Sequence, residues 1–236
     1  MLFSLYPLGD QAVVIELGQE INKETLDKVR AVSAFFDQHS IEWVIEYVPA
    51  FTTVSVFYDP LYFVNGSEDK LPYEKVCDQL KTFLANLKVN EASEPRKIEI
   101  PVCYGGELGP DLEVVAEHNH LTPEEVIHYH SMGDYLVYMI GFAPGFPYIG
   151  GMPEEIATPR KESPRLKIPA GSVGIAGKQT GVYPIETPGG WQLIGRTPMK
   201  LFRPGEDTPS ILRAGDRIQF KSITLKEFQE WEDGTK

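Results

Sequence analysis

Apolar and polar positions in the first ninety residues follow two different periods. The segments 12–17 and 52–58 are short and rich in β-branched and aromatic residues, which predicts strands. Residues 22–36 and 72–87 place apolar side chains near helical spacing, which predicts two amphipathic helices. A partly alternating segment, 41–48, lies between the first helix and the second of those strands. This order predicts a small open sheet with two helices on one face, in a ferredoxin-like arrangement.

The chain after residue 96 changes to shorter elements. Residues 97–102 and 135–141 read as strands, and 111–118 has the apolar spacing of a short helix. Thr122 and Glu125 form a capping box that begins another helix. The end of the chain adds a turn and strand at 213–220 and a short helix at 223–231.

The segment 141–198 differs from both patterns. Glycine or proline recurs every few residues, which excludes a long helix, and short apolar pieces such as 172–176 predict strands instead. A flexible linker of similar composition would lack large apolar residues, whereas this segment holds several aromatic ones. It is therefore predicted to be a compact, turn-rich β region whose aromatics and arginines suit a flat or anionic ligand.

A polar stretch at 91–96 contains a proline and reads as a linker. We therefore expect an α+β chain of two domains, 1–91 and 92–236.

Composition narrows the function classes. A net charge of −12 argues against nucleic acid and against an anionic membrane surface as partners, because both require basic patches. Cys77 and Cys103 lie in different segments and form no CxxC motif, so two free thiols in a reducing compartment are expected. The N-terminal residues lack the features of a signal peptide. These observations predict a cytoplasmic protein.

Four of the five histidines fall between residues 118 and 130. His128 and His130 stand two apart on a predicted helix and point to different sides, so a shared metal ion is not expected. His130 stands beside Ser131, directly ahead of the aromatic and arginine-rich segment. It is a candidate for a substrate-facing or acid–base role, with an ordinary helix-surface role as the alternative.

Residues 172–179 (SVGIAGKQ) are a near miss for a phosphate-binding loop. Ser172 stands where the first glycine belongs, Gln179 replaces the hydroxyl that binds magnesium, and a strand rather than a helix follows. A Walker-type site is excluded on these grounds. A looser phosphate-binding turn that includes Lys178 stays open.

Three arginines are the candidate anion ligands. Arg160 and Arg165 each follow a proline, and they form either an anion clamp or a solvated loop balanced by nearby glutamates at 154, 155 and 162. Arg196 is expected to pair with Asp216 or to reach a ligand. Trp191 follows two glycines and is either a core residue or a stacking platform.

Several long motifs in a fixed order resemble subunit 1 of the allophanate-hydrolase/carboxyltransferase family. The resemblance is strong over about 95–203 and looser over 1–90. The matching pieces are PVCYGG at 101–106, DLEVVA at 111–116, GFAPGFPYIGG at 141–151, PR at 159–160 and 164–165, IPAGSVGIAG at 168–177, QTGVYP at 179–184 and ETPGGWQLIGRTP at 186–198.

The resemblance implies a small α/β domain followed by a cyclophilin-like β-barrel. It also implies one subunit of an ATP-dependent 5-oxoprolinase, which converts 5-oxo-L-proline to L-glutamate with a related subunit 2 and a third, ring-opening subunit. ATP, with Mg²⁺, would be shared with those partners, and this chain carries no biotin site. The alternative that the family offers is a regulatory protein that inhibits autophosphorylation of a sporulation sensor histidine kinase.

The residues that match the family motifs are the candidates for the site. We expect His130 and Arg165 to be catalytic. The candidates for substrate binding are Phe142, Phe146, Arg160, Lys178, Gln179, Trp191 and Arg196.

Overall fold

The computed structural model describes residues 2–64, 70–85, 87 and 96–234. The chain divides into two compact units, Met1–Glu94 and Pro95–Lys236. The predicted boundary at residues 91–92, and all of the predicted linker except Arg96, lie outside the described residues. No helix in the described ranges is both long enough and apolar enough to cross a membrane.

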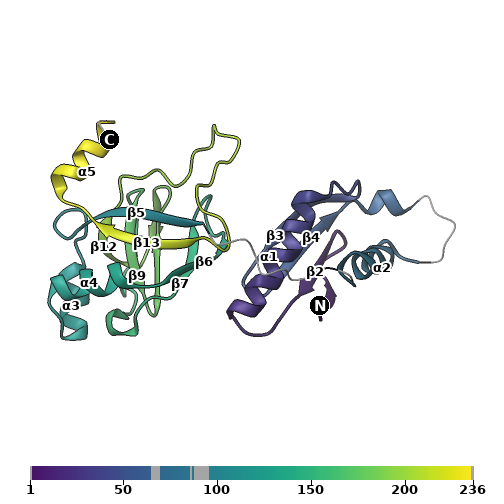
Figure 1. The fold of residues 1–236 in the computed structure, drawn as a ribbon, viewed down its shortest axis with the longest axis horizontal. Coiled ribbons are helices and arrows are strands. Elements are labelled where there is room, and N and C mark those ends of the chain that lie inside the picture. The colour runs from purple at the N-terminus through teal and green to yellow at the C-terminus, as the bar shows by residue number, and fades with distance from the viewer. Residues whose placement is uncertain (1, 65–69, 86, 88–95, 235–236) are drawn as a thin grey trace. The chain divides into compact units, whose positions relative to one another are not determined.

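The first unit is an antiparallel sheet with two helices (Figure 1). The sheet order is β1-β2-β4-β3, so the short first strand and β3 form its edges. The strands are β1 (Ser4–Pro7), β2 (Ala12–Glu16), β3 (Val44–Pro49) and β4 (Thr53–Tyr58), and the helices are α1 (Lys23–Gln38), the 3₁₀ turn η1 (Pro60–Phe63) and α2 (Pro72–Ala85).

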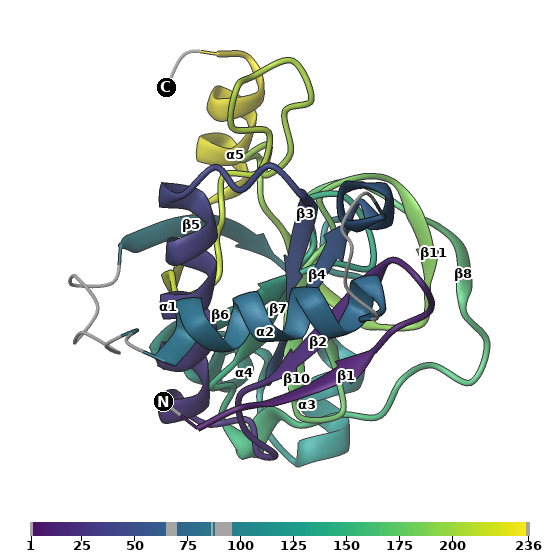
Figure 2. The same ribbon diagram turned by 90° about the vertical axis from the view of Figure 1, so that its right-hand side faces the viewer.

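The core of this unit follows from the alternation of its strands. Val54, Val56 and Tyr58 are buried on one face of β4, and Val13 and Ile15 do the same on β2. Helices α1 and α2 both lie across that face (Figure 2). The predicted ferredoxin-like arrangement stays a prediction; the observed sheet has an edge strand, β1, that precedes the first helix.

The second unit is built around a closed barrel of seven strands in the order β10-β7-β6-β13-β5-β12-β9. Its strands are β5 (Lys97–Tyr104), β6 (Tyr135–Ile140), β7 (Pro147–Gly150), β9 (Ser172–Ala176), β10 (Gln179–Val182), β12 (Gln192–Arg196) and β13 (Arg217–Ser222). A separate two-stranded ribbon pairs β8 (Arg165–Ile168) with β11 (Thr187–Gly189) (Figure 2). The helices are α3 (Leu112–Asn119), α4 (Pro123–Met132), the 3₁₀ turn η2 (Glu154–Ile156) and α5 (Leu225–Glu232).

The barrel is closed by strands that are distant in sequence. β13 pairs in parallel with β5, with Arg217 opposite Lys97 and Ser222 opposite Val102. Every other strand pair in the barrel is antiparallel. A mixed α/β chain with a β-barrel is thus confirmed, and the cyclophilin-like character of the barrel stays a prediction.

The two sides of the barrel wall carry different residues. Val173 and Ile175 of β9 and Ile194 of β12 belong to the main core. The intervening Gly174 carries no side chain, and Leu193 belongs instead to a second, smaller cluster with Phe146, Ile168 and Tyr183. Since neighbouring residues of a strand face opposite sides, this smaller cluster lies on the outer wall.

Candidate functional site

Two glycines make the outer wall flat enough to hold aromatic rings. A Cβ atom on Gly181 would lie 3.0 Å from the Trp191 ring and 3.3 Å from the Phe146 ring. A Cβ atom on Gly174 would lie 3.1 Å from Cβ of Trp191. The rings therefore pack directly on the backbone of β9 and β10, which a larger residue at either position would prevent.

The rings contact one another edge to face. Phe146 lies with its ring centroid 5.9 Å from that of Trp191 and 5.7 Å from that of Tyr183, at interplanar angles of 88° and 70°. Phe142 meets Phe146 at 5.4 Å and 73°. These are favourable geometries for aromatic pairs. We call the four residues Phe142, Phe146, Tyr183 and Trp191 the aromatic platform.

Phe142 differs from the rest of the platform. Its side chain is 70% exposed, and its backbone has φ of +64°, a left-handed conformation that is costly for a residue with a bulky side chain. An exposed aromatic ring held in such a conformation gains little from burial. Phe142 is therefore placed to contact something outside the chain.

A charged cluster adjoins β12 in the same unit. Asp111, just before α3, is 3% exposed and accepts hydrogen bonds from Nη2 of Arg165 at 2.8 Å and Nζ of Lys161 at 3.2 Å through Oδ1. Its Oδ2 accepts from the backbone N–H of Leu193 at 2.7 Å. Burial acts to raise the pKa of Asp111, but the hydrogen bonds from Arg165, Leu193 and Lys161 outweigh it and hold the pKa below its ordinary value. The carboxylate is thus ionised and fixes both cations.

The cations reach the aromatic platform electrostatically. Burial raises the pKa of Tyr183 to about 12, and the charges of Arg160 and Arg165 oppose that rise. Both guanidinium groups therefore lie close to the Tyr183 phenol. Arg160 itself is exposed.

Two polar atoms near this cluster are left for a ligand. Nη1 of Arg165 is buried and finds no hydrogen-bond partner among the described residues, although Nη2 is held by Asp111. Oε1 of Gln192 is in the same condition, while Nε2 of that side chain donates to the carbonyl of Pro159 at 3.0 Å. Buried donors and acceptors are almost always paired, so an unpaired donor and an unpaired acceptor are expected to meet a ligand or water.

His130 lies in a different environment. It is fully buried inside the barrel unit, stacked against Phe220 at a centroid distance of 4.4 Å. Its Nε2 lies 2.9 Å from Oγ1 of Thr180, which donates its only proton to the carbonyl of Gly174. Thr180 must therefore accept from Nε2, and Nδ1, 2.8 Å away from the Tyr104 hydroxyl, accepts from it. Burial lowers the pKa of His130 to about 3, so the ring is neutral.

The structure separates the candidate residues into three groups. Phe142, Phe146, Trp191, Arg160 and Arg165 gather around the aromatic platform, and His130 lies in the interior.

The other candidates lie elsewhere in the unit. Lys178, at the β9–β10 turn, forms an exposed ion pair with Glu154 at 2.7 Å, and Gln179 beside it is exposed. Arg196 lines a separate groove, where its Nε donates to the carbonyl of Ala170 at 2.8 Å. The expected pairing of Arg196 with Asp216 is wrong, because Asp216 is held by Arg96 at 2.8 and 2.5 Å.

Sequence reasoning missed Asp111, Lys161 and Gln192. Asp111 precedes an ordinary helix, and only the fold brings it to residues 50 and 54 positions further along the chain. The one local signal was its place at the start of the DLEVVA motif.

Comparison with known proteins assigns the class. The family model described as "Carboxyltransferase domain, subdomain C and D" matches residues 3–212, and this chain belongs to that family. A 5-oxoprolinase subunit of Bacillus subtilis (strain 168) is 51% identical over 233 residues, which cover 98% of this chain and 97% of the relative. The 5-oxoprolinase subunit of the same name from Escherichia coli O157:H7 is 42% identical over 218 residues, covering 91% and 94%.

A solved structure also resembles this chain. The crystal structure of PH0987 from Pyrococcus horikoshii, described as a conserved uncharacterized protein, matches with a TM-score of 0.56 at 50% sequence identity. The match covers 95% of this chain and 100% of PH0987.

Proposed function

We propose that this chain is one subunit of a multi-chain, ATP-dependent 5-oxoprolinase that converts 5-oxo-L-proline to L-glutamate in the cytoplasm. The observation that carries the proposal is the 51% identity to a 5-oxoprolinase subunit across 98% of this chain and 97% of that relative. The chain acts with a related subunit 2 and a third, ring-opening subunit. Its two units, Met1–Glu94 and Pro95–Lys236, serve as separate domains within the assembly.

The chemistry of the substrate explains why such a subunit needs cations. The lactam carbon of 5-oxoproline is a poor electrophile. Transfer of the γ-phosphoryl group of ATP to the lactam oxygen releases ADP and makes that carbon open to attack by water; cleavage of the C–N bond then opens the ring. Negative charge accumulates on the transferred group, and cations or N–H donors stabilise it.

The platform and the charged cluster suit 5-oxoproline. The substrate carries a carboxylate that accepts hydrogen bonds and a lactam N–H that donates one. Nη1 of Arg165 is the free donor and Oε1 of Gln192 the free acceptor near the cluster. Arg160 adds a second charge, and Phe142 with Phe146 offers apolar surface for the ring. In this proposal Arg165 binds the reacting molecule, and Asp111 and Lys161 position it.

His130 is a positioning residue in this proposal. Its ring ties Tyr104 of β5 to Thr180 of β10, one residue before the glycine on which Trp191 and Phe146 pack. The network thus holds the strand that carries the platform. Lys178 and Gln179 lie at the turn before that strand, and they stay candidate contacts for the nucleotide or for a partner subunit.

The test is turnover in the reconstituted enzyme. ATP hydrolysis that depends on 5-oxoproline should appear only when this chain is mixed with both partner subunits. Arg165→Ala should lower that turnover by about a hundredfold or more, because a buried charged hydrogen-bond donor is lost. Arg165→Lys should recover part of it. Lys221→Ala, which removes an exposed cation paired with Glu99 at 3.1 Å, is the matched control and should leave turnover unchanged.

Two results would count against the proposal. An absence of 5-oxoproline-dependent turnover in every mixture would remove the enzymatic role, and binding to a sensor histidine kinase would then be measured as the alternative. Full turnover with a correctly folded Arg165→Ala chain would keep the enzyme assignment but move the substrate away from the platform.

A further inference from the structure

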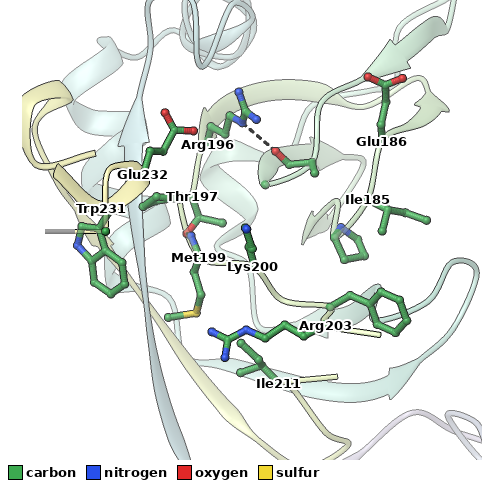
Figure 3. Close-up of a pocket in the computed structure, with 16 residues that line it drawn as sticks. Ile185, Glu186, Arg196, Thr197, Met199, Lys200, Arg203, Ile211, Trp231 and Glu232 are labelled. Atoms are coloured by element: carbon green, nitrogen blue, oxygen red, sulfur yellow. Dashed lines mark hydrogen bonds between the residues drawn. The ribbon is translucent and has the colours of Figure 1, made fainter. Parts of the chain in front are cut away.

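A groove of about 1010 Å³ lies in the second unit, apart from the aromatic platform. It is bounded by the end of β12, the residues that follow that strand, the segment 184–186 and helix α5 (Figure 3). Its volume stands at the upper end of the range for small-molecule sites. A single five-membered-ring amino acid would fill only a small part of it, so the groove suits a larger ligand.

Three cations line this groove. Arg196 uses Nε on the carbonyl of Ala170, and its two Nη groups have no partner among the residues that the structure describes. Lys200 is exposed and forms no ion pair within those same residues. Arg203 forms an exposed pair with Glu206 at 3.1 Å, which is a weak interaction that a ligand can replace. Figure 3 shows Lys200 between the other two side chains.

The positive charge of the groove is a local exception. The chain as a whole has a net charge of −12 and repels anions on average. Two carboxylates also line the groove, but Glu186 is paired with Lys167 at 3.3 Å. Glu232 is left as the one carboxylate that opposes an anionic ligand.

The groove also has an apolar part. Trp231 of α5 is half-buried and lies beside Met199 and Ile211 in the lining (Figure 3). An indole ring with one open face is a good surface for stacking a flat heteroaromatic group. The groove thus joins a row of cations to a stacking surface.

We propose that this groove binds a nucleoside triphosphate, with the phosphates along Arg196, Lys200 and Arg203 and the base against Trp231. The proposal rests on the proposed function, in which the subunit takes part in an ATP-consuming reaction, and it assigns the nucleotide to a surface distinct from the aromatic platform. Partner subunits would complete the site around the γ-phosphate.

The test is calorimetric titration of the full chain alone with MgATP, inorganic tripolyphosphate and adenosine. MgATP should bind more tightly than either fragment, because it uses both parts of the groove. Arg196→Gln together with Lys200→Gln should weaken MgATP binding by about a hundredfold, since each lost charged hydrogen bond contributes about tenfold. Trp231→Leu should weaken MgATP and adenosine severalfold and leave tripolyphosphate unchanged. Glu232→Gln should tighten binding, and Lys221→Gln is the neutral control.

Some outcomes would overturn the inference. MgATP that fails to bind at millimolar concentration, or that binds the Arg196→Gln, Lys200→Gln chain as tightly as the parent, would exclude the groove. Tripolyphosphate that binds as tightly as MgATP would exclude the stacking role of Trp231.

Measurements on the reconstituted enzyme separate this inference from the proposed function. Turnover with an unchanged KM for ATP in the doubly substituted chain would remove the groove and keep the enzyme. MgATP binding that the double substitution abolishes, without 5-oxoproline-dependent turnover in any mixture, would keep the groove and remove the enzyme.

Discussion

Two buried polar groups of the same barrel unit differ in how they are completed. The ring nitrogens of His130 are both engaged, by Tyr104 and Thr180, and the ring is neutral. Asp111 is charged and holds two cations, one of which keeps a buried N–H group without a partner among the described residues. A polar group with every hydrogen bond made stabilises a fold, whereas a charged group with a donor to spare can also bind. The comparison assigns His130 to structure and the Asp111 cluster to recognition.

The largest effect is expected when the charged cluster loses its anion. Asp111→Ala should lower the free energy of unfolding of the barrel unit by about 3 kcal/mol, because Arg165, Lys161 and the Leu193 amide lose a buried acceptor. Urea unfolding followed by near-UV circular dichroism measures it. Asp134→Ala, which removes an exposed partner of Arg217, is the control and should change stability little. A loss below about 0.5 kcal/mol for Asp111→Ala would show that the cluster is not fixed by its carboxylate.

Acid separates the two groups by pH window. The pKa of His130 is about 3 in the folded chain and about 6.5 when unfolded, so the unfolded state binds more protons between these values. Stability should therefore fall as the pH drops below 6.5, by about 2 kcal/mol between pH 6.5 and 5. Asp111, with its lowered pKa, contributes stability that is lost only as the pH falls below its unfolded value near 4. A His130→Gln chain should lose the upper window and keep the lower one; an unchanged pH profile would contradict the neutral, buried ring.

The flat wall beneath the platform is expected to matter less. Gly181→Ala places a methyl group 3.0 Å from the Trp191 ring, which must shift, at a cost of about 1.5 kcal/mol in unfolding free energy. Thermal unfolding with tryptophan fluorescence would report both the cost and the movement of the ring. Gly205→Ala, where a Cβ atom meets nothing within 4 Å, is the matched control. Equal effects of the two substitutions would show that the rings do not pack on the strand.

The smallest effect on stability is expected at Phe142. Phe142→Gly should be about 1 kcal/mol more stable than Phe142→Ala, because only glycine adopts φ of +64° without cost. Chemical denaturation of the two variants measures this difference directly. Both variants should also raise the KM for 5-oxoproline in the reconstituted enzyme. An unchanged KM would remove Phe142 from the proposed site.

Local patterns explain which parts of the fold could be predicted. The capping boxes at Thr122 and Thr224 are both present, because such a box involves residues only three apart. Asn22 caps α1 in the same local way. The strands of the first unit also lie close to their expected bounds, since period-2 alternation is read within a few residues.

Partners distant in sequence could not be predicted. Arg165 was expected to be balanced by glutamates of its own loop, yet it pairs with Asp111, 54 residues earlier. Lys178, by contrast, does pair with Glu154 across an exposed turn. Which side of the barrel wall a residue occupies depends on closure of all seven strands, and so the platform and the interior position of His130 appear only in the folded structure.

The parallel pairing of β5 with β13 has a consequence for synthesis of the chain. The first strand of the barrel leaves the ribosome near the start of the second unit, and the strand that lies beside it ends at residue 222. The barrel cannot close before almost the whole polypeptide has been translated, so β5 must wait with one edge open. An open apolar edge is a site of aggregation, and a nascent chain of this protein is expected to depend on chaperones until its last strand emerges.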